Sequence, residues 1–177
     1  MKHSDYCQLW VKQKDRLAEW RDALHKQCVQ LRDAFIARVE PPNEPWINPV
    51  SDERNSYVNL LYLHPETKRM KGHIPQEALT EKGELMFGLE ITLDRDRNSF
   101  PKETCYLQLA VRFNASQAQF SFFKTESDGA ETPPGWVSDI PKFVELMLER
   151  LQSYVEFDPF AGARDKTGIG FLHNAEF

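Results

Sequence analysis

The first forty residues constrain the fold of this chain more than any other part of its sequence. From Asp5 to Val39 there is neither glycine nor proline, and apolar residues recur at spacings of three, four and seven. That pattern predicts one long amphipathic helix, capped by Ser4 or Asp5 and ended by the Pro41–Pro42 pair. At 1.5 Å per residue, about 35 residues span about 50 Å, whereas a compact domain of this size measures about 25 to 30 Å across. Part of the helix must therefore overhang the domain or break.

A stripe of large apolar side chains runs along this predicted helix at nearly heptad spacing. Its members are Trp10, Leu17, Trp20, Leu24 and Leu31. Part of the stripe must pack on the rest of the chain, but an overhanging part leaves apolar side chains in water unless a partner covers them. We therefore expect these residues to form the interface of a homodimer or of a stable complex with another protein.

Length and charge narrow the class of protein. The chain has 177 residues and a formal net charge of −5, which fits one acidic domain that repels phosphate backbones and anionic membranes. Its longest apolar stretches fall far short of the about 18 residues that cross a bilayer. Three cysteines, Cys7, Cys28 and Cys105, cannot all pair, and no apolar leader is evident. We expect a cytoplasmic protein with no nucleic-acid or membrane partner.

The predicted fold class is α+β. The expected single domain, residues 1–177, divides into a long helix (1–40), a proline-rich strap over the core (41–56), an antiparallel sheet of four or five strands (57–124), a C-terminal helix packed on the sheet (137–157) and an irregular tail (158–177). The tail carries Phe160, Phe171 and Phe177. Because these rings have a large apolar area to bury, we expect the tail to dock on the body.

The clearest strands lie between residues 85 and 124, where apolar and mixed positions alternate. Leu85 to Leu93 and Cys105 to Phe113 each carry five apolar residues on one face. If Asp94 lies opposite Thr104, all five apolar positions of one strand meet all five of the other, so we expect that register. A turn at residues 114–117 then leads to a third strand of a meander.

This register predicts a trough on the second face of the sheet, because Gly88, Ala110 and Ser121 would share one row. Small side chains let a ligand or a chain segment approach the backbone closely. The candidate binding residues around the trough are Gly88, Glu90, Tyr106, Gln108, Ala110, Arg112, Ser121 and Phe123. The alternative is that the second helix or the tail of the chain itself fills the trough.

Catalytic and metal-binding side chains form no complete set in the sequence. His3 and Cys7 lie one helical turn apart, as do His25 and Cys28, but two ligands do not make a zinc site. The helical cysteines have no fixed base, and Cys105 lies on the apolar face of its strand, where a thiol stays neutral. We therefore predict no metal, no cofactor and no catalytic residue.

These observations favour a non-enzymatic protein-interaction module over an enzyme. Such a module, adaptor, chaperone-like or immunity-like, would act through the long first helix and a sheet face. The alternative is a small-molecule-binding domain or a small hydrolase that uses the trough around Gly88, Ala110 and Ser121.

Overall fold

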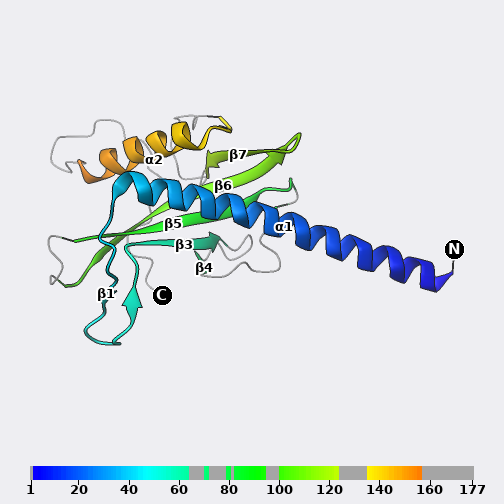
Figure 1. The fold of residues 1–177 in the computed structure, drawn as a ribbon, viewed down its shortest axis with the longest axis horizontal. Coiled ribbons are helices and arrows are strands. Elements are labelled where there is room, and N and C mark those ends of the chain that lie inside the picture. The colour runs from blue at the N-terminus through cyan, green and yellow to red at the C-terminus, as the bar shows by residue number, and fades with distance from the viewer. Residues whose placement is uncertain are drawn as a thin grey trace, which may run out of the picture.

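A computed structural model of the chain describes residues 2–63, 70–71, 79–80, 82–94, 100–123 and 135–156. Its elements, in chain order, are α1 (His3–Val39), β1 (Trp46–Ile47), β2 (Arg54–Asn55), β3 (Val58–Leu63), β4 (Met70–Lys71), β5 (Leu85–Leu93), β6 (Glu103–Asn114), β7 (Gln117–Phe122) and α2 (Ile140–Val155). Figure 1 shows the long first helix, the sheet and the second helix. The predicted α+β class is confirmed.

Helix α1 is continuous from His3 to Val39. Of the two outcomes predicted for a helix of this length, the overhang is therefore present and the break is not. The backbone N–H of Lys2, the N-cap residue, donates to Asp5 Oδ2 over 2.7 Å. At the other end Glu40 adopts a left-handed conformation (φ 50°), and its N–H donates to the Ile36 carbonyl over 2.9 Å. The prolines that follow cannot extend the helix. The N-terminal part of α1 projects well beyond the sheet (Figure 1).

The main sheet is antiparallel, with the strand order β4-β3-β5-β6-β7. Strand β4 is a two-residue edge strand that pairs only with Tyr62 and Leu63. Strands β6 and β7 are joined through Ala115 and Ser116, whose φ angles of 46° and 71° are those of a two-residue hairpin turn. The turn predicted at residues 114–117 is therefore present.

The register of β5 against β6 differs from the predicted one by two residues. Thr92 faces Thr104, and Leu93 faces Glu103. Asp94 consequently meets Lys102, and the Lys102 Nζ lies 2.5 Å from Asp94 Oδ2. A two-residue shift leaves every side chain on its predicted face, so apolar alternation cannot distinguish the two registers. The observed register provides a carboxylate for a lysine side chain that is only 1% exposed.

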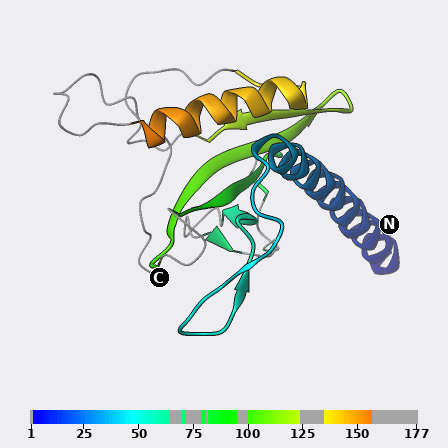
Figure 2. The ribbon, with the colours of Figure 1, turned by 60° about the vertical axis from the view of Figure 1, so that its left-hand side comes forward.

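Both helices pack on the apolar face of the sheet and bury a common core. The helix residues buried there are Leu24, Cys28, Leu31 and Phe35 of α1, and Phe143, Val144 and Met147 of α2. The backbone N–H of Lys142 donates to the side chain of Asp139, the N-cap of α2, over 2.9 Å. An ion pair of 3.0 Å between Arg38 and Glu145 joins the two helices. Figure 2 shows α2 lying along β6 and β7 while α1 leads away from the sheet.

The strap differs from the extended connector expected for residues 41–56. It contains a small hairpin of β1 and β2, closed by a turn in which the backbone N–H of Val50 donates to Asn48 Oδ1 over 2.9 Å. The ring of Trp46 packs against Phe100, with 6.2 Å between centroids. The tail over residues 158–177, with its expected docking, lies outside the described residues.

Candidate interaction surfaces

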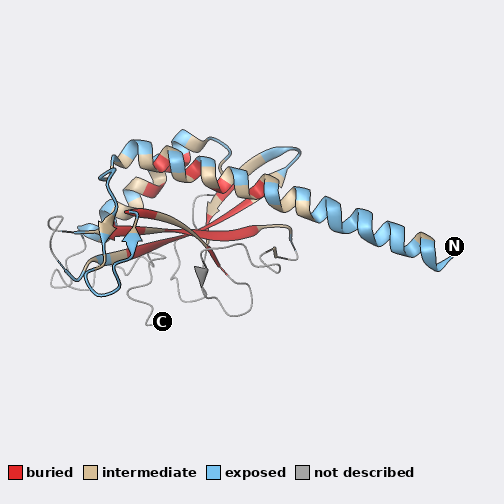
Figure 3. Ribbon diagram, turned by 60° about the horizontal axis from the view of Figure 1, so that its bottom comes forward, coloured by how far each residue is buried: buried red, intermediate tan, exposed pale blue. Residues whose placement is uncertain are grey.

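Four large apolar side chains lie exposed on one face of the overhanging part of α1. They are Tyr6, Leu9, Trp10 and Leu17, which are 59%, 54%, 60% and 43% exposed. At about 100° of rotation per residue, all four point within about 60° of Leu24, a core residue of the same helix. The stripe that packs on the sheet therefore continues beyond the sheet, where the helix is exposed on all sides (Figure 3). These four residues are termed the overhang stripe.

The five predicted interface residues differ in how far packing on the sheet buries them. Leu24 and Leu31 are fully buried in the core of their own chain, so a partner cannot reach them. Trp20 is half-buried against Gly83, which has a φ of 78° and no room for a Cβ: an added Cβ would come within 2.6 Å of the indole ring. Trp10 and Leu17 remain accessible.

Tyr6 and Leu9 were absent from the predicted interface, although the signal for them was present. They precede Trp10 by four residues and by one, and their positions continue the helical period of the buried stripe. Val11 is also 50% exposed, but it points about 140° away from Leu24 and so lies outside the stripe. Lys14 flanks the stripe, with its Nζ 5.4 Å from the centroid of the Trp10 ring.

The second face of the sheet does not form the predicted trough. Gly88 lies opposite Gln108, whereas Ala110 lies between Met86 and Ser121. The pairing of Ala110 with Ser121 is as predicted, but the two-residue shift of β5 removes Gly88 from their row. The row of three small residues was therefore a wrong prediction.

Half of the eight candidate residues on this face are buried. Gly88, Tyr106, Gln108 and Ala110 are buried, and Glu90, Arg112, Ser121 and Phe123 are half-buried. Helix α2 does not cover them, because it packs on the opposite face through Phe143. The alternative in which the second helix fills the trough is therefore also wrong.

The polar groups of this face are largely engaged with one another. Glu90 accepts a hydrogen bond of 3.0 Å from Asn59 Nδ2 and lies opposite Tyr106 across β5 and β6. Burial raises the pKa of Tyr106, a hydrogen bond with Thr104 opposes that rise, and Glu90 adds to it, so the phenol stays a neutral donor. Gln108 Oε1 is buried and has no hydrogen-bond partner in the described part of the chain.

Within the described part of the chain, Arg112 forms no ion pair with an acidic side chain. Its guanidinium lies 4.0 Å from the centroid of the Trp136 ring and donates to Gln119 Oε1 over 3.2 Å. Gln119 is the β7 partner of Arg112, whereas Trp136 comes from the segment before α2, which no strand periodicity places.

The cysteines and histidines that the structure describes, which exclude His64, His73 and His173, form no catalytic arrangement with one another. Burial raises the pKa of the Cys105 thiol to about 12, and burial raises the pKa of Cys28 as well, so both stay neutral. Cys7 is exposed, with its Sγ 3.5 Å from His3 Nε2, and His25 Nδ1 is hydrogen-bonded to the Tyr62 hydroxyl. Within the described ranges, no three His, Cys, Asp or Glu side chains gather as metal ligands would.

A cavity that the sequence did not indicate lies where α1, the strap and β3 meet. It has a volume of about 690 Å³ and is lined by Arg32 and Ile36 of α1, by Pro41, Pro42, Asn43 and Pro45, and by residues 56–61. Its size falls within the roughly 300–1,000 Å³ of ligand sites. We term it the strap groove.

Comparison with protein-family models, with curated proteins and with solved structures found no match. Of the helices described, neither is long and apolar enough to cross a membrane. A function for this chain is therefore inferred from its surfaces.

Replacing Ala110 with tryptophan tests whether the second face is core or a ligand site. Ala110 is 4% exposed between Met86 and Ser121, so we expect overpacking to lower the free energy of unfolding by about 1–3 kcal/mol. Urea unfolding measures the loss. The control Ala37→Trp, at an exposed site on α1, should change stability by less than about 0.5 kcal/mol. Unchanged stability of Ala110→Trp would instead support a binding cavity on this face.

Proposed function

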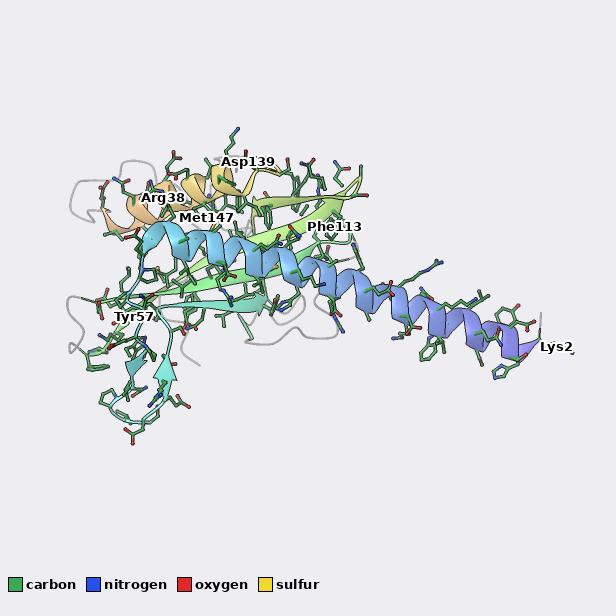
Figure 4. All side chains as sticks on the ribbon, in the orientation of Figure 1. Lys2, Arg38, Tyr57, Phe113, Asp139 and Met147 are labelled. Atoms are coloured by element: carbon green, nitrogen blue, oxygen red, sulfur yellow. The ribbon has the colours of Figure 1, made fainter. Side chains whose placement is uncertain are left out.

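We propose that this chain is a non-enzymatic protein-interaction module that pairs with a second copy of itself through the overhang stripe. One observation carries the proposal. The apolar stripe that α1 buries against its own sheet continues past Trp20 with no described element to cover it. In Figure 4 the side chains of the overhang, toward Lys2, stand clear of the sheet and of α2.

The exposed area matches what an interface needs. With about 150–250 Å² on a whole aromatic side chain and exposed fractions near one-half, the stripe offers roughly 400 Å² of apolar surface. A standard interface buries about 800 Å² per partner, of which somewhat over half is apolar. The stripe therefore supplies about the apolar share of one such interface, and the stems of flanking lysines and arginines can supply the rim.

The geometry favours an antiparallel pair of helices. The stripe faces the side of α1 on which its own sheet lies, so a parallel partner would bring the two sheets into collision. Antiparallel overhangs instead lie side by side with one body at each end. In that arrangement Leu17 of one chain meets Tyr6 of the other, and the two Trp10 side chains lie near the centre.

The charges beside the stripe agree with this orientation. Asp5 and Arg16 lie on the same flank of α1, and antiparallel pairing brings Asp5 of each chain close to Arg16 of the other. Such rim pairs add little affinity, but they favour the orientation in which opposite charges meet.

Sedimentation at micromolar concentration tests the proposal. We expect the wild-type chain to sediment at twice its mass of 20.6 kDa, and Trp10→Glu to sediment as a monomer. Loss of a central tryptophan contact should weaken association by about 30-fold or more. The matched control is Val11→Glu, which adds the same charge one residue away. The Val11 side chain is 50% exposed, but it lies outside the stripe. This variant should leave the dimer intact.

Two results would contradict self-association through the stripe. If the wild-type chain sediments only as a monomer, a second copy of the chain is not the partner. A dimer that persists in Trp10→Glu, or dissociates equally in Val11→Glu, would place the interface elsewhere.

Two further parts of the proposal concern chemistry and location. The Ser121 hydroxyl donates to the Phe122 carbonyl over 3.4 Å, and Gly88 does not share its row, so the trough proposed for a small hydrolase or a small-molecule binder gives less support than the overhang stripe gives to the module. A cytoplasmic location is part of the proposal because Cys28 and Cys105 are buried and unpaired, as thiols are in a reducing compartment.

A further inference from the structure

Strand β3 has an edge that is paired over only part of its length. On one side it pairs with β5 from Val58 to Tyr62, and on the other β4 reaches only Tyr62 and Leu63. From Val58 to Leu61 this outer edge therefore has no neighbouring strand among the described residues.

The hydrogen-bond pattern shows which backbone groups this edge presents. The Thr92 N–H donates to the Tyr57 carbonyl over 2.8 Å, so Tyr57 and every second residue after it bond toward β5. The N–H and C=O groups of Val58 and Leu60 consequently point outward. Unpaired groups of this kind are the template on which another strand can add.

These outward groups belong to residues that line the strap groove. Val58 and Leu60 line the cavity of about 690 Å³ together with Pro41, Pro42 and Pro45. Prolines have no N–H, so these three residues donate no backbone hydrogen bond to β3. The groove thus combines an open strand edge with space beside it.

We propose that residues 167–171 of this chain, which lie outside the described residues, add to the outer edge of β3 as a strand in the strap groove. The inference is independent of the self-association proposed above, since it involves a different surface. It rests on where α2 ends, on the reach of the chain beyond it and on the pattern of this segment.

Helix α2 ends near the end of the sheet at which β3 and β6 begin, which is where the proposed strand would be added. Tyr154, in its last turn, packs against the core, and it lies close enough to Glu103 at the start of β6 for that carboxylate to help raise its pKa, which burial raises most. Cys105, Ile91 and Val58 are successive partners across β6, β5 and β3. A strand added to the outer edge of β3 would therefore lie about three strand spacings, or roughly 14 Å, from Cys105 across the sheet.

The intervening chain is long enough to cross this distance. From Glu156 to Thr167 is 11 residues. Fully extended, 11 residues span up to about 36 Å, more than twice the distance across the sheet.

The segment also has the pattern of a strand laid close against another backbone. Thr167, Ile169 and Phe171 alternate with Gly168 and Gly170, so an extended conformation places every side chain on one face. The side-chain face can pack toward Ile36 and the proline rings. The glycine face allows close approach of the backbone.

Amide hydrogen exchange, measured by NMR on the full chain and on a chain ending at Glu156, tests the inference. We expect the amides of Val58 and Leu60 to exchange at least about tenfold faster in the shortened chain. The Asn59 amide bonds toward β5 and should not change. A synthetic peptide of residues 165–173, added to the shortened chain, should restore the protection. Equal exchange of Val58 and Leu60 in the two chains would overturn the inference.

A second variant keeps the test valid if the shortened chain folds poorly. Ile169→Pro in the full chain removes a backbone donor from the proposed strand, so it should also accelerate exchange at Val58 and Leu60. Ala161→Pro, in the tail but outside the segment, is its control. Unchanged exchange in Ile169→Pro would exclude the strand. Because sedimentation reports on the overhang stripe alone, failure of one proposal does not imply failure of the other.

Discussion

Replacing Phe143 with alanine is expected to lower the free energy of unfolding by about 4 kcal/mol, the middle of the range for buried Phe→Ala changes. Phe143 is fully buried at the first turn of α2. Its ring centroid lies 5.7 Å from that of Phe120 and 5.1 Å from that of Phe122, both on β7. The substitution removes the ring that joins helix to strand, and the two remaining rings cannot fill the space without moving their backbone.

Urea unfolding with unchanged slope would measure this loss as a lower midpoint. The control is Glu149→Ala, an exposed side chain on the same helix, for which we expect a change within about 0.5 kcal/mol. A loss below about 1.5 kcal/mol for Phe143→Ala would mean that α2 packs on the sheet less closely than its burial indicates.

Replacing Asp94 with asparagine is expected to lower the free energy of unfolding by about 2 kcal/mol, because it removes a charge-assisted hydrogen bond to a lysine side chain that is 1% exposed. The Lys102 side chain is 1% exposed and lies 2.5 Å from Asp94, with its Nζ 5.0 Å from the centroid of Phe100. The value is below that of a fully buried ion pair because the Asp94 side chain is 17% exposed and the Phe100 ring still faces the ammonium group. Asparagine has nearly the shape of aspartate and can still accept the 3.0 Å hydrogen bond from the Tyr57 hydroxyl, so the loss reports on charge.

This ion pair also predicts how stability depends on pH. The hydrogen bond from Lys102 holds the pKa of Asp94 below its usual value, burial opposes the shift, and the hydrogen bond from Tyr57 adds to it. A lowered folded-state pKa contributes full stability above the unfolded value of about 3.9 and loses it as pH falls through the folded value. The wild-type protein should therefore lose more stability than Asp94→Asn on acidification, and the two curves should converge.

Unfolding free energies measured from neutral pH down into this acid range check the prediction. The control is Glu103→Gln, which removes an exposed carboxylate at the start of β6. This variant should lose as much stability at low pH as the wild type does. If the free energies of unfolding of Asp94→Asn and of the wild type fell by the same amount on acidification, the pair with Lys102 would not be the source of the pH dependence.

The sequence alone determined the features that depend on local periodicity. The absence of glycine and proline up to Val39, together with the apolar spacing, was enough for the long helix, since helix period and helix breakers act within a few residues. Strict alternation in β5 and β6 likewise placed each side chain on its correct face. The length of the helix, compared with the size of a domain, was enough to require an overhang or a break.

Only the tertiary structure decided how these elements meet. Two registers of β5 on β6 satisfy the same alternation, and the contact of Lys102 with Asp94 belongs to one of them. The position of Trp20 against Gly83 determines where the buried stripe of α1 ends and the exposed stripe begins. The strap groove exists because prolines of the strap lie beside an unpaired stretch of β3. Each of these features joins residues of different elements, and contacts between elements leave no periodic signal in either segment alone.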